Sequence, residues 1–138
     1  MVVTSQMPAP TARGQAARQR YLGERVQTVS PAGLVTMLYD GLVSDLELAE
    51  AALAGGDVQV ANERLLHAQA IVLELRAGLK PELWSGGPAL ASLYMFFAEQ
   101  LMKANIAKDA DLAAEVRQLV EPLRDAWHQA AANVRGAG

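Results

Sequence analysis

Two histidines are the side chains of this 138-residue chain best suited to acid–base chemistry. His67 falls with Glu63 and Arg64 on the polar side of a helical repeat, and His128 follows Trp127 near the end of the chain. A histidine can act as a general base near neutral pH, but it needs a nucleophile or a second acid–base group beside it. No such partner is evident, so we interpret both histidines as ordinary solvent-facing side chains. An enzyme that used either one would lose its activity when that histidine was changed.

Other residue types that support catalysis or metal binding are missing or unsuitably spaced. The chain has no cysteine, which rules out disulfides and thiolate metal sites and suits a reducing compartment. Asp45, Glu47 and Glu50 lack the Glu-x-x-His spacing of di-iron sites in helical bundles, so we interpret them as part of a solvated face. Gly86-Gly87 lacks the lysine and hydroxyl of a phosphate-binding loop. We therefore expect no enzymatic activity, no cofactor and no metal.

Charge and hydropathy exclude two further classes of partner. The net charge of -3 and the pI near 5.3 argue against nucleic acid, because phosphate binding needs a clustered positive face. No apolar stretch approaches the roughly 18 residues of a membrane span, and the first residues lack the apolar core of a secretion signal. We expect a cytosolic protein without membrane insertion.

From residue 21 onward the apolar residues recur with a helical period, and no segment alternates as a half-buried strand would. Ser30 and Pro31 suit the start of a first long helix, the glycine pair at 55–56 suits its end, and Asp57 and Asp109 can cap later helices. The expected helices cover residues 31–54, from Asp57 to about Leu79, from about Ala89 to Ile106, and onward from Asp109. Short connections between them predict an all-α fold, an antiparallel four-helix bundle.

The expected core is one apolar stripe on each helix. The second helix should bury Ala61, Leu65, Ala68, Val72, Leu75 and Leu79, and the last helix Leu112, Val116, Leu119, Leu123, Trp127 and Ala130. Pro122 interrupts the last helix, because proline cannot donate to the carbonyl of Gln118 and its ring crowds that turn. We expect a kink there, or a helix that splits near Glu121. The expected domains are a flexible leader over residues 1–20, the bundle over 21–134 and a disordered tail over 135–138.

Two segments carry more apolar residues than one core stripe needs: Leu34, Val35, Met37, Leu38, Tyr39, Leu42 and Val43 in the first helix, and Leu93, Tyr94, Met95, Phe96 and Phe97 in the third. A central helix packed on two sides would have the same pattern, so composition leaves groove and core both open. Gly41 lies within the first helix, where its missing side chain could form a notch for another backbone. Met37, Met95 and Met102 are adaptable side chains that suit either a partner surface or a core gap.

Several motifs, in unbroken order over residues 21–131, resemble the FliS family of flagellar secretion chaperones. They are YLGERVQTVSP at 21–31, Leu34 and MLYDG at 37–41, then AQAI at 68–71, Leu93-Tyr94, ANI at 104–106 and LRDAW at 123–127. The resemblance implies an antiparallel four-helix bundle with a short N-terminal helix or cap segment. It departs at Gly33, where many relatives have a polar or acidic residue, so the reciprocal capping box is absent here.

The resemblance also implies a function. Family members hold the C-terminal segment of flagellin in hydrophobic grooves, prevent its premature polymerisation and deliver it to the flagellar type III export gate. The expected partners are therefore flagellin and the export gate, and exposed grooves allow a weak homodimer when flagellin is missing. The rival from another class is a helical-bundle adaptor that binds a folded protein and ignores an unfolded peptide.

By motif position, the resemblance assigns a tyrosine near the chain start that lies over a groove until the client displaces it, here Tyr21. Val26 and Thr28 extend this cap. The full flagellin-binding groove and cap implied in this way consist of Tyr21, Val26, Thr28, Leu34, Met37, Leu38, Tyr39, Leu42, Tyr94 and Phe97. Which of them line the groove and which fill the core is left open by the sequence.

Overall fold

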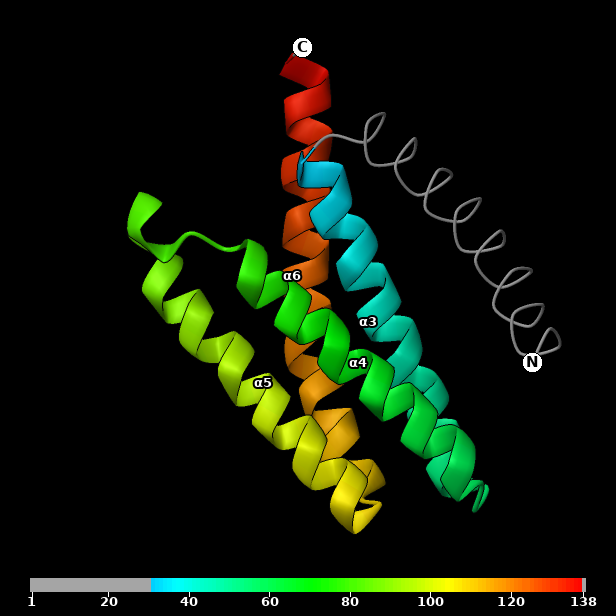
Figure 1. Ribbon diagram of the computed structural model, residues 1–138. Helices are drawn as coiled ribbons and strands as arrows, with labels where there is room; N and C mark the ends of the chain where they lie inside the picture. Colours follow the sequence, from blue (N-terminus) through cyan, green and yellow to red (C-terminus); the bar gives the residue numbers. More distant parts are fainter. Residues whose placement is uncertain (1–30, 138) are drawn as a thin grey trace, which may run out of the picture. The chain divides into compact units, whose positions relative to one another are not determined.

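The computed structural model describes residues 31–137, and its chain divides into two compact units, Met1–Leu34 and Val35–Gly138. The described residues form the α-helices α3 (Pro31–Ala54), α4 (Val58–Gly78), α5 (Gly87–Ala107) and α6 (Ala110–Ala137), with a short 3-10 helix η1 (Pro81–Leu83) and no strand (Figure 1). Only the first turn of α3 belongs to the first unit, so the packing described below is that of the second. Tyr21, Val26, Thr28 and the predicted leader boundary at residue 20 lie outside the described residues.

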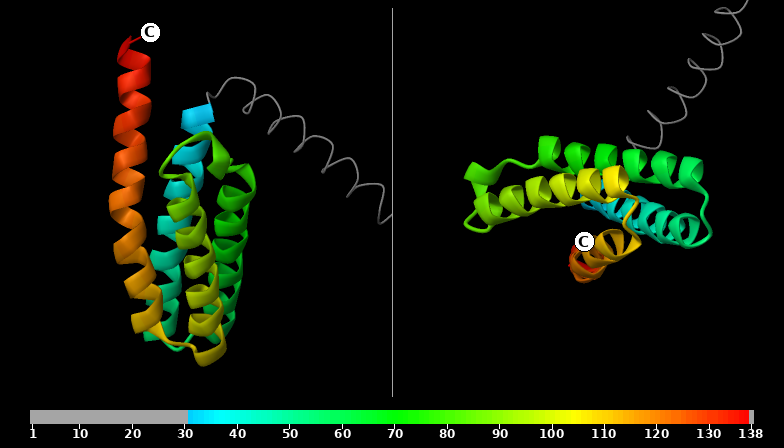
Figure 2. Two further views of the ribbon diagram at one scale, coloured as in Figure 1. Left: turned by 90° about the vertical axis from the view of Figure 1, so that its left-hand side faces the viewer. Right: turned by 90° about the horizontal axis from the view of Figure 1, so that it is seen from below.

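Successive helices of the second unit run in opposite directions and are joined by short connections (Figure 2). α5 packs against both α4 and α6. α3 reaches each of the other three helices through a side-chain contact, with Asp45 meeting Arg64 of α4, Tyr39 meeting Tyr94 of α5, and Glu50 meeting Arg117 of α6. The predicted all-α antiparallel four-helix bundle is confirmed.

The helix ends follow the local signals in the sequence. Asp57 accepts a hydrogen bond from the amide of Val60 at 3.2 Å and caps α4, and Asp109 accepts from the amide of Leu112 at the same distance at the start of α6. α3 ends at Ala54, and Gly56 follows with a positive φ of 78°, which glycine adopts without strain. The capping and stop signals therefore predicted these boundaries correctly.

The predicted core stripe is right for α4 except at Leu79, which follows the end of the helix and is only partly buried, and it is partly wrong for α6. Ala61, Leu65, Ala68, Val72 and Leu75 are all buried. In α6, however, Val120 and Ala131 are buried in place of the predicted Leu119 and Ala130, which are exposed. One position along a helix is a rotation of about 100°, so the choice between neighbouring apolar residues depends on the angle at which the helix meets its partners.

α6 passes through Pro122 without a break and remains helical to Ala137. The expectation that the helix splits near Glu121 is wrong. Pro122 is exposed, so its ring lies on the solvent side of the helix, where the missing amide hydrogen bond is the main cost. The helix also extends into residues 135–137, for which the sequence predicts a disordered tail.

Gly41 does form a notch, but a side chain of the same chain occupies it. A Cβ added at Gly41 would lie 3.3 Å from Cδ1 of Ile71, which projects from α4 against α3. The expectation that this notch receives the backbone of a partner is therefore wrong, and Gly41 instead allows close packing of α3 on α4.

Replacing Gly41 by leucine is expected to destabilise the protein by about 1–3 kcal/mol, because the new side chain would displace the nearly buried Ile71. Urea unfolding measures this effect. Gly41→Ala is the matched control, since the gain in helix propensity of about 1 kcal/mol offsets a small adjustment of the terminal methyl of Ile71. A leucine variant as stable as the alanine variant would contradict the close packing.

Candidate partner-binding surface

The groove residues implied by the family resemblance separate into two groups in the structure. Tyr39, Leu42, Tyr94 and Phe97 are buried, with at most 2% of any of these residues exposed. Leu34 and Met37 are exposed and Leu38 is partly buried. In this conformation only the second group offers side-chain surface to a partner, and the first group belongs to the core.

The centre of the buried group is a pair of tyrosines that joins α3 to α5. The hydroxyls of Tyr39 and Tyr94 are hydrogen-bonded at 2.7 Å, and their ring centroids lie 6.4 Å apart. Trp127 of α6 stacks on Tyr39 with centroids 6.5 Å apart and an interplanar angle of 29°. Burial raises the pKa of both tyrosines above the ordinary value, because the ionised phenolate would lose its hydration. Three helices therefore meet at this aromatic cluster.

Most accessible apolar side chains lie elsewhere, on α4 and α5. Leu66 and Leu73 of α4 are each about half exposed and lie seven positions apart, which places them on one side of the helix. Met95 and Met102 of α5 have the same spacing and similar exposure. Further exposed apolar residues of α5 are Phe96 and Ile106. Because α4 packs against α5, these two helices carry much of the surface on which an apolar client could dock.

The apolar period of α4 predicts only its buried stripe and does not single out Leu66 and Leu73, which are exposed. Their seven-residue spacing on the polar side of the helix was the available signal. The sequence pattern also does not show which members of the apolar run at 93–97 are buried and which are exposed. Tyr94 and Phe97 face inward, whereas Met95 and Phe96 are exposed.

Asp45 of α3 is a buried carboxylate, and its interpretation as a solvated residue is wrong. Only 3% of it is exposed, and its carboxylate contacts Nδ1 of His67 and accepts a hydrogen bond from the guanidinium of Arg64 at 3.2 Å. Both partners come from α4 and are themselves well exposed. The sequence feature that indicates this burial is the position of Asp45 beside the buried Leu46, within the apolar stripe of α3. This contact fixes the register of α3 against α4.

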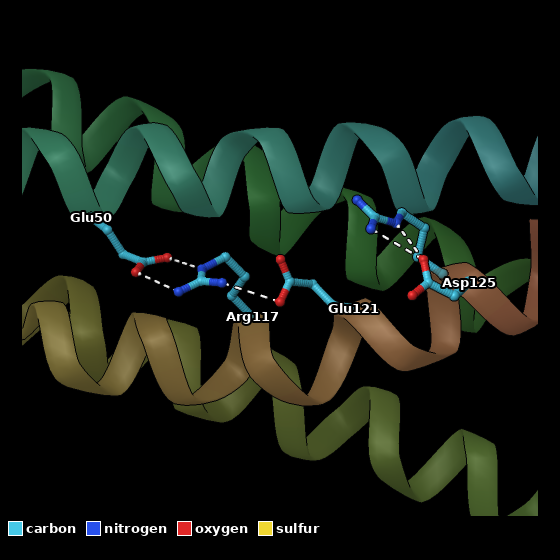
Figure 3. A network of polar contacts seen from close by, with 5 residues as sticks. Glu50, Arg117, Glu121 and Asp125 are labelled. Carbon is cyan, nitrogen blue, oxygen red and sulfur yellow. Dashed lines mark hydrogen bonds and ion pairs between the residues drawn. The ribbon is translucent and has the colours of Figure 1, made fainter.

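Arg117 connects α6 to α3 in the same way (Figure 3). Its Nε and Nη2 donate to the two carboxylate oxygens of Glu50 at 2.5 and 3.1 Å, and its Nη1 donates to Glu121 at 3.1 Å. The hydrogen bonds to Glu50 raise the pKa of Arg117 above its ordinary value, because they favour the charged guanidinium. A bidentate pair of this kind holds the first half of α6 on α3.

The second histidine is also paired with an aspartate of α3. Nε2 of His128 lies 2.7 Å from a carboxylate oxygen of Asp40, and about half of each side chain is exposed. Over residues 31–137, no group of three or more histidine, aspartate or glutamate side chains is placed to hold a metal ion. Within that same range no helix is both long and apolar enough to cross a membrane. Both histidines are thus paired with an aspartate of α3, His67 with Asp45 and His128 with Asp40.

Comparison with known proteins assigns the family. The family model described as Flagellar protein FliS matches residues 13–134. The chain belongs to the FliS family. The flagellar secretion chaperone FliS of Bacillus subtilis is 34% identical over 110 residues, which cover 80% of this chain and 82% of that protein. The chaperone of the same name from Salmonella typhimurium is 37% identical over 108 residues, with coverage of 75% and 78%.

The fold agrees with this assignment. A crystal structure of a bacterial flagellar chaperone has a TM-score of 0.69 to this chain at 21% identity, and the match covers 87% of this chain and 98% of the other. The resemblance of the sequence motifs to FliS is therefore confirmed, and this FliS-family chain is a flagellar secretion chaperone.

Proposed function

We propose that this FliS-family chain binds the C-terminal segment of flagellin, keeps it from polymerising and delivers it to the flagellar type III export apparatus. The observation that carries the proposal is the exposed apolar surface of a FliS-family bundle, with Leu66 and Leu73 on α4 and Met95 and Met102 on α5. In this proposal the protein works in the cytosol as a binding protein without catalytic activity or cofactor.

The physical basis is burial of apolar surface by a segment that orders on contact. An amphipathic helix that lies in a groove between two helices buries its own apolar face together with theirs. The gain must exceed the conformational entropy that the client loses when it becomes ordered. Met37 and Leu38 of α3 are proposed to contact the client as well. Leu34, Tyr21, Val26 and Thr28, which the family resemblance implies, are also proposed to take part in client binding.

Calorimetric titration with a synthetic peptide of the C-terminal segment of the host's flagellin tests the proposal. We expect binding with a negative heat-capacity change, because apolar surface is removed from water. Leu38→Asp should weaken binding at least tenfold, which corresponds to about 1.4 kcal/mol, because a carboxylate would enter the apolar contact.

The matched control is Leu48→Asp, which changes the same residue type on the same helix at a position that is nearly half exposed and about 15 Å from Leu38 along the helix axis. It should bind the peptide as the native chain does, and thermal unfolding shows whether each variant is folded. Equal affinities for the two variants would remove Leu38 from the site. No binding by the native chain would reject the proposal in favour of an adaptor that binds a folded partner.

A further inference from the structure

The two halves of α6 are attached to the bundle to different degrees. Before Pro122, the fully buried Ala113, Val116 and Val120 pack into the core, and Arg117 is paired with Glu50 of α3. After Pro122, the residues that pack against the core are Leu123 and Trp127, and both remain partly exposed. Ala131 is the one buried residue among the described side chains of this half. The second half therefore has much less apolar contact to hold it in place.

Pro122 lies at the boundary between these halves. It has no amide hydrogen, so the helical hydrogen bond to the carbonyl of Gln118 is missing at this turn. Breaking a helix at a point where a hydrogen bond is already absent costs less than breaking it elsewhere. Arg117 is paired with Glu50 and Glu121 on the near side of this point (Figure 3). The first half would thus stay in place if the second half moved.

The second half of α6 covers the aromatic cluster. Trp127 stacks on Tyr39, whose hydroxyl is bonded to that of Tyr94 on α5. His128 of this half is paired with Asp40 of α3, and both of these side chains are about half exposed. A polar contact between two side chains that are this exposed to solvent adds little to stability. The covering therefore depends mainly on two partly buried side chains, Leu123 and Trp127.

We propose that residues 123–134 form a lid that opens at Pro122 and exposes Tyr39 and Tyr94 to an apolar helix of the client. This inference rests on the proposed function, because the client that takes the place of the lid is the flagellin segment. It explains how Tyr39 and Tyr94 can be groove residues although the closed structure buries them. The uncovered surface presents two aromatic rings and two hydroxyls between α3 and α5, which suits one face of an amphipathic helix.

Hydrogen exchange of the full chain tests the lid without any client. Amides of residues 123–134 should exchange at least about tenfold faster than those of residues 113–120, because a segment with few buried contacts opens separately from the core. Addition of the flagellin peptide should raise exchange of the lid further, since the peptide holds it open. Uniform protection along α6 would overturn the proposal.

Cross-linking tests whether opening is required for binding. The chain has no cysteine, so the variant D40C/H128C carries only two thiols, one on α3 and one on the lid. A short bis-methanethiosulfonate reagent that joins them should reduce peptide affinity at least tenfold, and a reductant should restore it. The matched control E50C/R117C joins α3 to the first half of α6, and its cross-linked form should bind as well as its reduced form.

The outcomes separate the lid from the proposed function. Loss of binding only in the cross-linked D40C/H128C protein supports the lid. Equal binding by both cross-linked proteins would overturn it while leaving the proposed function intact. If the native chain does not bind the peptide, the proposed function fails, and the lid is then decided by the exchange rates of residues 123–134 in the protein alone.

Discussion

Replacing Phe97 by alanine is expected to lower the free energy of unfolding by about 3–5 kcal/mol, which is the usual cost of removing a buried phenylalanine ring. Phe97 is fully buried, and its ring lies 6.2 Å from that of Phe96. The cost arises because the lost apolar contacts are not recovered and a cavity remains in the core. Urea unfolding followed by circular dichroism measures the change.

Phe96 is a matched control for this experiment. It is the adjacent residue of the same type on the same helix, but 45% of it is exposed. Phe96→Ala should change the free energy of unfolding by no more than about 0.5 kcal/mol. If the two variants were equally stable, Phe97 would be a surface residue of the groove, as its family position allowed, and the orientation of α5 would have to be revised.

The second large effect is expected at alkaline pH. Burial raises the pKa of Tyr39 and Tyr94, so the folded chain keeps both phenolic protons at pH values where the unfolded chain, with tyrosine pKa values near 10, releases them. Unfolding then releases protons. The contribution of this pair to stability is intact below about pH 10 and decreases as the pH rises, by up to about 2.7 kcal/mol per pH unit for two tyrosines.

Urea unfolding at a series of pH values from about 8 to 11.5 measures this slope, since the range includes the ordinary tyrosine pKa. The double variant Y39F/Y94F is the control. It removes both titrating hydroxyls together, so neither is left without its partner in the core. Its stability should lose this part of the pH dependence while the rest is retained. A slope above pH 10 that is the same in the native chain and the double variant would show that the hydroxyls are accessible to solvent.

Much of the secondary structure could be predicted from local signals. Pro31, Gly56, Asp57 and Asp109 act within one turn of their own positions, through a fixed φ, a positive φ or a cap on a free amide. Such effects do not depend on the rest of the fold. The helical apolar period predicted the bundle for a similar reason, because any helix with one apolar face must cover it against another element.

The polar interior and the candidate site were harder to predict. The sequence alone predicts that Asp45 lies on the surface. Its burial depends on Arg64 and His67, which contact it from another helix. Carboxylates are rarely buried unless they are paired, and pairing between distant residues is not visible in a linear pattern. The buried position of Tyr39 likewise depends on the placement of Tyr94 and Trp127.

By itself, the sequence determined the helical class, the end of α3, the starts of α4 and α6 and, through its ordered motifs, membership of the FliS family. These follow from interactions between near neighbours and from the order of motifs along the chain. The tertiary structure decided which apolar residues are core and which are accessible, as the adjacent Phe96 and Phe97 show. That choice depends on the angle each helix presents to its neighbours, and the packing of all the helices of the bundle together sets this angle.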